Sequence, residues 1–317
     1  MLKKTFAILI FLGCVHSVCA QDNRPLPFLD INPDVRAAGM GNSTMGEAKG
    51  MYLYSNPTSI LQGDVKRKIY ASYSYGLMPE INNERESYHA TSVGVRLFNR
   101  HALMVGFRYF GGLSVPSIDS NGNPKAAIEP NDWSIDMAYT FKFNNHLAAY
   151  LGGSFIQSTL DETSYLAGAN GGVYYSNDFG FNADKAVYTV GLGFNNLGAA
   201  TMTDKGNDFT MPGSLGLGGS VGLPLCKNHR INAALSTRYF IIPSSAAAFT
   251  ANLGLEYELF NIAALRTGYY MDTNASENSY FSVGLGFKYK FVSVEAAYCF
   301  KNNKDFNNMQ LGISFQL

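Results

Sequence analysis

The chain has 317 residues, and its 24 basic and 24 acidic residues give a formal net charge of zero at pH 7. Charged residues make up 15% of the sequence, whereas soluble domains usually carry about a quarter charged residues. This deficit favours a surface that faces something other than water. A neutral chain also lacks the basic footprint of a nucleic-acid-binding protein, so we expect no nucleic-acid partner.

Residues 1–20 have the features of a secretory signal peptide. Lys3 and Lys4 precede a short apolar run, and a plausible cleavage site ends at Ala20 before Gln21. The apolar run is too short to cross a bilayer as a helix, and no later apolar stretch approaches the roughly twenty residues that a transmembrane helix needs. We therefore expect an exported protein without a transmembrane helix.

Two cysteines, Cys226 and Cys299, follow the predicted signal peptide. The first falls in a predicted turn and the second toward the opposite end of a predicted strand. A disulfide requires α-carbons within about 7 Å of each other. We therefore expect two unpaired thiols.

Most of the remaining chain alternates with a two-residue period. In the clearest segment, Phe281, Val283 and Leu285 alternate with Ser282 and Gly284. Similar segments recur, each close to the roughly ten residues that a tilted membrane strand needs. We predict about fourteen strands, over residues 69–76, 88–98, 102–111, 133–143, 147–158, 172–179, 186–196, 213–223, 230–240, 249–258, 262–271, 280–291, 292–301 and 309–317.

Short and long connections alternate between these segments, as do the periplasmic turns and external loops of outer-membrane barrels. The short ones are 99–101, 144–146, 226–229 and 260–261, and the long ones are 77–87, 112–132, 159–171, 198–212, 241–248 and 272–279. We predict an all-β, antiparallel transmembrane barrel over residues 69–317, with both termini in the periplasm. A soluble β-sandwich is the alternative, but its strands average about six residues and its inward face would be apolar.

Residues 21–68 do not alternate and are rich in proline and glycine. Asn56-Pro57 is expected to cap and begin a short helix that runs through Leu61. The segment precedes the first strand, so it begins in the periplasm. We predict that it lies under the barrel or plugs the lumen.

Essentially the whole mature chain resembles a known family, and a few short motifs carry the resemblance. Residues 27–41 (PFLDINPDVRAAGMG) and 54–57 (YSNP) resemble the amino terminus of the PorV/PorQ family, within the fatty-acid-transporter-like (FadL-like) outer-membrane barrels. Residues 190–198 and 211–215 resemble landmarks of the family's middle strands. The residues that match the family's amino-terminal hatch motif are Asn56, Pro57, Gly39 and Gly41.

The resemblance implies a fourteen-stranded barrel with an amino-terminal hatch, a Bacteroidetes-type host, and a non-enzymatic role in type IX protein secretion or cell-surface attachment. The implied partners are secretion-system proteins or sorting-domain cargo, besides outer-membrane lipid, lipopolysaccharide and the barrel-assembly machinery. The same resemblance allows a transporter of hydrophobic small molecules. Such a transporter needs an apolar pocket, to which Tyr75, Leu77, Met78, Phe110, Leu113 and Phe240 could contribute. A general porin is a weaker alternative.

The sequence offers no clear catalytic, cofactor or metal site. His101, His146 and His229 occupy matching turns, but no acidic or cysteine partner recurs with ligand spacing, so we interpret them as polar turn residues. The loop carboxylates Glu84 with Glu86, and Asp161 with Glu162, could hold a cation, and solvated loop charge explains them equally well. We expect no enzyme.

Charged side chains of both signs fall on the predicted inward face. In an open pore such residues would set ion selectivity, and in a plugged barrel they could pair with one another or hold the hatch. We favour the structural network. The inward candidates are Arg96, Arg108, Arg238, Glu256, Arg266, Lys288 and Glu295. Inward glycines, which let another backbone approach closely, are predicted at Gly216, Gly218, Gly284 and Gly286.

Overall fold

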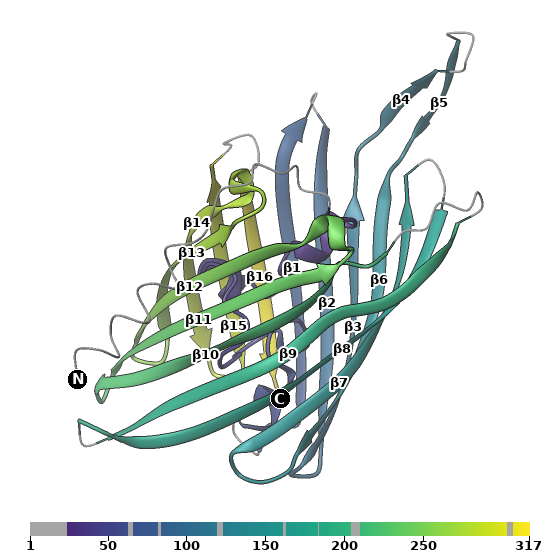
Figure 1. The fold of residues 1–317 in the computed structure, drawn as a ribbon. Coiled ribbons are helices and arrows are strands. Elements are labelled where there is room, and N and C mark those ends of the chain that lie inside the picture. The colour runs from purple at the N-terminus through teal and green to yellow at the C-terminus, as the bar shows by residue number, and fades with distance from the viewer. Residues whose placement is uncertain are drawn as a thin grey trace, which may run out of the picture.

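The computed structural model describes residues 24–62, 66–81, 84–118, 123–160, 163–182, 184–203, 210–302 and 307–317. The predicted signal peptide and the Asp161-Glu162 pair lie outside these residues. Within the described residues, fourteen antiparallel strands close into a barrel, and a separate two-stranded hairpin projects beyond one end (Figure 1). The predicted fold class is confirmed.

The barrel strands are β1 (Ile69–Ile81), β2 (Glu84–Leu97), β3 (His101–Gly111), β6 (Asn131–Lys142), β7 (Leu147–Thr159), β8 (Thr163–Phe181), β9 (Asp184–Thr203), β10 (Gly213–Cys226), β11 (His229–Ile242), β12 (Ala248–Leu259), β13 (Ala263–Asp272), β14 (Tyr280–Tyr289), β15 (Val292–Lys301) and β16 (Asn308–Gln316). The projecting hairpin consists of β4 (Val115–Ile118) and β5 (Pro124–Ile128). The helical elements are η1 (Pro27–Asp30), α2 (Val35–Gly39), η2 (Tyr52–Tyr54), η3 (Pro57–Leu61), η4 (Ser244–Ala246) and η5 (Ser276–Asn278). No helix in the described ranges is long and apolar enough to cross a membrane.

The two faces of the wall follow the sequence alternation. On β14, the side chain of Leu285 faces outward and is 58% exposed. Ser282 lies an odd number of residues away, so its side chain faces inward, where it is 0% exposed. Strand β1 pairs with β16, from Tyr70 opposite Gln316 to Leu77 opposite Met309, and this pairing closes the wall. A closed wall leaves no unpaired edge, so a surface covered with large apolar side chains is suited to lipid.

Several connections are shorter than the sequence predicts. We expected loops over 77–87, 159–171 and 198–212, but strands β1, β2 and β8 extend through most of the first two, and β9 extends into the third as far as Thr203. Strands β8 and β9 reach 19 and 20 residues, about twice the length needed to cross the membrane. The expected loop over 112–132 contains the β4–β5 hairpin. Glycine and alanine weaken the strand signal in the extended parts, and pairing with neighbouring strands compensates for it.

Residues 24–62, called here the amino-terminal segment, lie inside the barrel (Figure 1). The Asp34 side chain caps α2 by accepting hydrogen bonds from the backbone N–H groups of Arg36 and Ala37, at 3.1 and 3.4 Å. Helix α2 packs against β13 to β16, and η3 packs against β2, β3, β6 and β7 on other parts of the wall. The segment therefore joins two separate parts of the wall through the lumen.

Candidate functional site

A row of glycines seats the amino-terminal segment against the wall. Gly39 lies against Gly284, where a Cβ on either residue would come within 3.1 Å of the other's Cα. Gly41 adopts a φ of +65° and donates its N–H to the Ser282 hydroxyl at 2.9 Å. Gly268 on β13 faces the backbone of Met40 and Gly41. Glycine is required in this row because two backbones are in direct contact.

Asn56 organises the second half of the segment. Its side chain is fully buried, and its Oδ1 accepts hydrogen bonds from the Thr58 N–H and hydroxyl at 3.0 and 2.7 Å. Its Nδ2 donates to the Gly46 carbonyl at 2.8 Å. Pro57 occupies the first turn of η3, so the predicted cap and short helix through Leu61 are confirmed, as a 3-10 helix.

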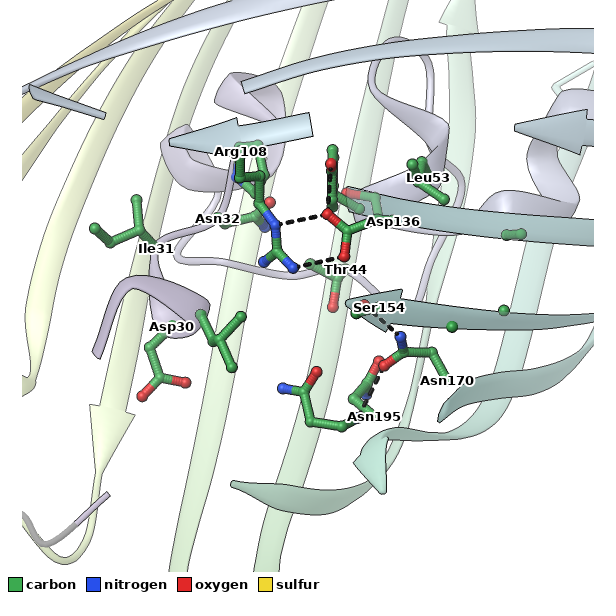
Figure 2. A pocket seen from close by; sticks show the side chains of 18 of the residues that line it. Asp30, Ile31, Asn32, Thr44, Leu53, Arg108, Asp136, Ser154, Asn170 and Asn195 are labelled. Atoms are coloured by element: carbon green, nitrogen blue, oxygen red, sulfur yellow. Dashed lines mark hydrogen bonds and ion pairs between the residues drawn. The ribbon is translucent and has the colours of Figure 1, made fainter. Parts of the chain in front are cut away.

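A first buried ion pair lies where η2 meets β3 and β6 (Figure 2). Arg108 donates from Nη2 to Asp136 Oδ1 at 2.8 Å and from Nε to Oδ2 at 3.0 Å. Tyr54 of the amino-terminal segment donates its hydroxyl to Asp136 at 2.9 Å, and its ring lies 5.0 Å from the Arg108 guanidinium. Tyr54 thereby links the Arg108–Asp136 ion pair of the barrel wall to the amino-terminal segment.

A second contact of this kind involves Arg24, at the start of the described chain. Its Nη2 lies 2.6 Å from Asp272 Oδ2, and its Nε lies 3.6 Å from Asp30. The guanidinium also lies 4.8 Å from the centre of the Phe240 ring. Arg24 therefore fixes the beginning of the segment to β11 and β13.

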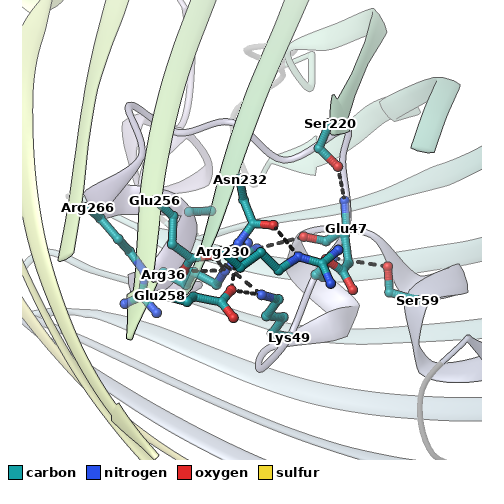
Figure 3. Close-up of polar contacts among 12 residues, drawn as sticks. Arg36, Glu47, Lys49, Ser59, Ser220, Arg230, Asn232, Glu256, Glu258 and Arg266 are labelled. Atoms are coloured by element: carbon teal, nitrogen blue, oxygen red, sulfur yellow. Dashed lines mark hydrogen bonds and ion pairs between the residues drawn. The ribbon is translucent and has the colours of Figure 1, made fainter. Parts of the chain in front are cut away.

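The largest group of charges surrounds Glu256 on β12 (Figure 3). Arg36 of the amino-terminal segment contacts both carboxylate oxygens, at 2.7 Å from Nη2 and 3.0 Å from Nε. Arg266 donates to Glu256 at 2.6 Å and to Glu295 at 3.0 Å. Lys49 contacts Glu256 at 3.5 Å and also pairs with Glu258. The Glu256 carboxylate of β12 therefore contacts Arg266 of the neighbouring strand β13, as well as Arg36 and Lys49 of the amino-terminal segment.

Glu256 is 1% exposed, so its charge depends on these partners. Burial works against a charged guanidinium at Arg36, but the nearby carboxylates, Glu256 first, outweigh it and raise the pKa of Arg36 above its ordinary value. Asn232 adds a neutral hydrogen bond to Glu256 at 2.8 Å. The group is thus an ionised, hydrogen-bonded lock between the segment and the wall.

The other charged candidates differ in their contacts. Arg96 is buried and donates from Nε to the Ile60 carbonyl at 3.1 Å, so it also holds the segment. Arg238 faces the lumen without an ion pair to any described carboxylate. Lys288 is exposed and lines a cavity of about 250 Å³ at the short-turn end, together with Glu256, Arg266 and Glu295. Ion pairs therefore join three of the seven predicted luminal charges, Glu256, Arg266 and Glu295, and Lys288 lines the cavity beside them.

Sequence reasoning missed the partners that the amino-terminal segment supplies. Arg24, Arg36 and Lys49 gave no periodic signal, because the segment does not alternate. Asp136 was also missed, although it shares the inward face of β6 with Ser134, so the two-residue period could have identified it. Arg36 is separated from Glu256 by 220 positions, and no local pattern connects them.

Other candidate groups remain dispersed. Among the described residues, no set of three or more histidine, cysteine or acidic side chains could hold a metal ion. His101 contacts the Tyr139 hydroxyl at 2.6 Å, and His146 contacts the Ser176 carbonyl at 3.1 Å. Cys226 is exposed, Cys299 is buried, and both are free thiols.

Two of the cavities beside the amino-terminal segment are small, and polar side chains contribute much of their lining. One, of about 90 Å³, is lined by Arg108, Asp136 and several asparagines (Figure 2). A second, of about 140 Å³, is lined by Arg24, Tyr270 and Gln310 among others. The apolar candidates Met78 and Phe110 instead pack against Phe28 and Leu29 of the segment. The segment's own side chains thus occupy the space that an apolar ligand pocket would need.

Comparison with known proteins gives one family match and several structural matches. A family model described as "Type IX secretion system protein PorV" matches residues 20–247. No curated protein sequence matches the chain significantly.

The structural matches are distant in sequence. The Pseudomonas putida toluene transporter TodX is 12% identical with a TM-score of 0.62, covering 89% of this chain and 98% of its own. The Ralstonia pickettii toluene transporter TbuX is 12% identical with a TM-score of 0.56, covering 90% and 98%. A Pseudomonas aeruginosa FadL homologue is 9% identical with a TM-score of 0.52, covering 89% and 98%. At these identities the likeness shows the fold alone.

These structures share the FadL-like barrel, and the family model covers well over half of the chain. Barrel and family together indicate the outer membrane. The protein is therefore a member of the PorV family of type IX secretion system proteins, built on a FadL-like outer-membrane barrel.

Proposed function

We propose that this protein is a non-enzymatic outer-membrane component of type IX protein secretion or cell-surface attachment. It acts by binding secretion-system proteins or sorting-domain cargo through its loops and rims. The observation that carries the proposal is the PorV family match over residues 20–247. The filled lumen supports it, because a barrel blocked by its own ion-paired segment is better suited to presenting surfaces than to conducting solutes.

In this proposal, residues 21–68 are the hatch and residues 69–317 are the membrane barrel, after removal of a signal peptide at residues 1–20. The short turns face the periplasm, and with them both termini. The β4–β5 hairpin then faces outward, where several of its residues, including Val115 and Pro124, are exposed. An isolated two-stranded ribbon is only marginally stable in water. Contact with a partner protein would stabilise the hairpin, so we assign it as a contact point.

A transporter of hydrophobic small molecules is the second candidate, supported by the FadL-like fold. An apolar ligand needs a mainly apolar pocket with a few placed polar groups. The cavity around Asp136 is instead small and mainly polar, and the cavity around Arg24 is small and lined by polar and apolar groups alike. The secretion role is therefore the better account of the interior.

Deletion of the gene in its host tests the proposal. We expect sorting-domain cargo to disappear from the medium and the cell surface and to accumulate in the periplasm, as measured by quantitative proteomics of the three fractions. Reintroduction of the wild-type gene should restore secretion. Unchanged cargo distribution, combined with loss of uptake of a labelled lipophilic substrate, would reject the secretion role in favour of the transporter.

A further inference from the structure

The cavity beside Asp136 contains an unusual concentration of unengaged hydrogen-bond donors. Asn195, Asn196 and Arg238 all line it, and none of these three side chains makes a hydrogen bond with another described residue. Arginine carries five N–H donors, and each asparagine amide carries two. All three side chains are half-buried, so water can reach their donors, and a ligand that enters the cavity can replace that water. The charges around the cavity indicate the chemistry of such a ligand.

Two carboxylates, Asp30 and Asp136, line this cavity together with Arg108 and Arg238. Arg108 is neutralised by Asp136, and Arg24 by Asp272 with help from Asp30. Arg238 has no comparable carboxylate among the described residues, and its guanidinium lies 6.0 Å from the centre of the Phe240 ring. An inward guanidinium without a carboxylate is a ready partner for an anion, especially a planar one that can accept two parallel hydrogen bonds.

A bulge in the wall presents the two asparagines. The β8–β9 pairing shifts register between Ala169 and Gly171, so that Asn195 and Asn196 together oppose Asn170. Asn196 has a φ of +54°, and its N–H donates to Asn170 Oδ1 at 2.8 Å. A bulge breaks strict alternation and re-aims side chains, so both consecutive asparagines reach the same cavity (Figure 2).

The position and size of the cavity restrict its ligand. Along β11, Arg238 lies six residues beyond Asn232, or about 20 Å farther from the short-turn end than the lock at Glu256. The cavity volume of about 90 Å³ holds roughly three waters or one small organic acid. Its lining is polar, so it offers little to a long alkyl chain.

We infer that the luminal chamber formed by Arg238, Asn195 and Asn196 is a binding site for a small hydrophilic carboxylate that enters from the long-loop end. Arg238 neutralises the carboxylate, and the asparagine amides donate to its remaining oxygen lone pairs. This site is independent of the proposed secretion role, because neither the lock at Glu256 nor the projecting hairpin takes part in it.

Titration of the purified full-length protein with isotope-labelled acetate, followed by ligand-observed NMR, tests the inference. Wild-type protein should bind acetate saturably, should ignore the neutral isostere acetamide, and should gain no affinity for octanoate. Arg238→Gln should weaken acetate binding by at least about tenfold, since a charge-assisted contact is lost. Arg238→Lys should retain part of the affinity.

Arg230→Gln is the matched control, because Arg230 lies on the inward face of the same strand near the short-turn end and contacts Asn232 at 3.0 Å. The affinity of this variant for acetate should be within twofold of the wild-type affinity. The absence of saturable acetate binding in the wild type would overturn the inference. Equal binding by Arg238→Gln, or markedly tighter binding of octanoate than of acetate, would overturn it as well. Secretion by the gene-complemented host is a separate readout, so failure of one proposal does not decide the other.

Discussion

Glu256→Gln should lower the free energy of unfolding by about 3–5 kcal/mol, the usual cost of removing one partner from a buried ion pair. The substitution keeps the side-chain volume but removes the negative charge that Arg36, Arg266 and Lys49 share. Their positive charges would then remain close together in a poorly solvated place. Urea unfolding in lipid vesicles measures the effect, with the single tryptophan, Trp133 on β6, as the fluorescent probe.

Glu80→Gln is the matched control for this experiment. Glu80 pairs with Arg85 at 3.2 Å, but the two side chains are 53% and 45% exposed. An exposed pair contributes at most about 1 kcal/mol. Glu295→Gln, which removes one contact to Arg266, should fall between the two. If Glu256→Gln and Glu80→Gln have the same stability, the lock does not hold the structure together.

Gly268→Ala should displace the amino-terminal segment from its seat. The added methyl group would clash with backbone atoms of Met40 and Gly41, so either the segment or the wall must move. Overpacking of this kind costs about 1–3 kcal/mol, and here the segment can yield more easily than the closed wall. We therefore expect trypsin to cleave after Arg36 or Lys49 in folded barrels of the variant, whereas Arg36 is buried and protected in the wild type.

Gly180→Ala makes the same chemical change at a position where an added Cβ meets nothing within 4 Å. It should leave both the protease pattern and the unfolding curve unchanged. Protection of Arg36 in the Gly268→Ala variant, at wild-type stability, would mean that the glycine row does not seat the segment.

The sequence predicts the wall well because membrane strands obey a simple physical rule. Lipid outside and polar groups inside impose a two-residue period, and residues such as Leu285 and Ser282 follow it. The ends of β8 and β9 were predicted poorly because they extend beyond the region where lipid imposes the period. There, cross-strand pairing decides the structure, and a single strand carries little information about its partner.

The site was predicted only in part, for a related reason. Glu256 and Arg266 face inward by parity, so the alternation identified them as luminal charges. The alternation contains no information about Arg36, which reaches Glu256 from a segment of irregular structure. The bulge at Asn195 and Asn196 breaks the parity itself, so counting along β9 places one of the two asparagines on the wrong face.

We expect the barrel, closed by its own amino-terminal segment, not to act as a pore. Conductance of the purified protein in planar lipid bilayers tests this claim most directly. We predict no stable open channel for the wild type, and new or fluctuating conductance for Gly268→Ala, in which the segment is displaced. A large, steady conductance in the wild-type protein would contradict the account.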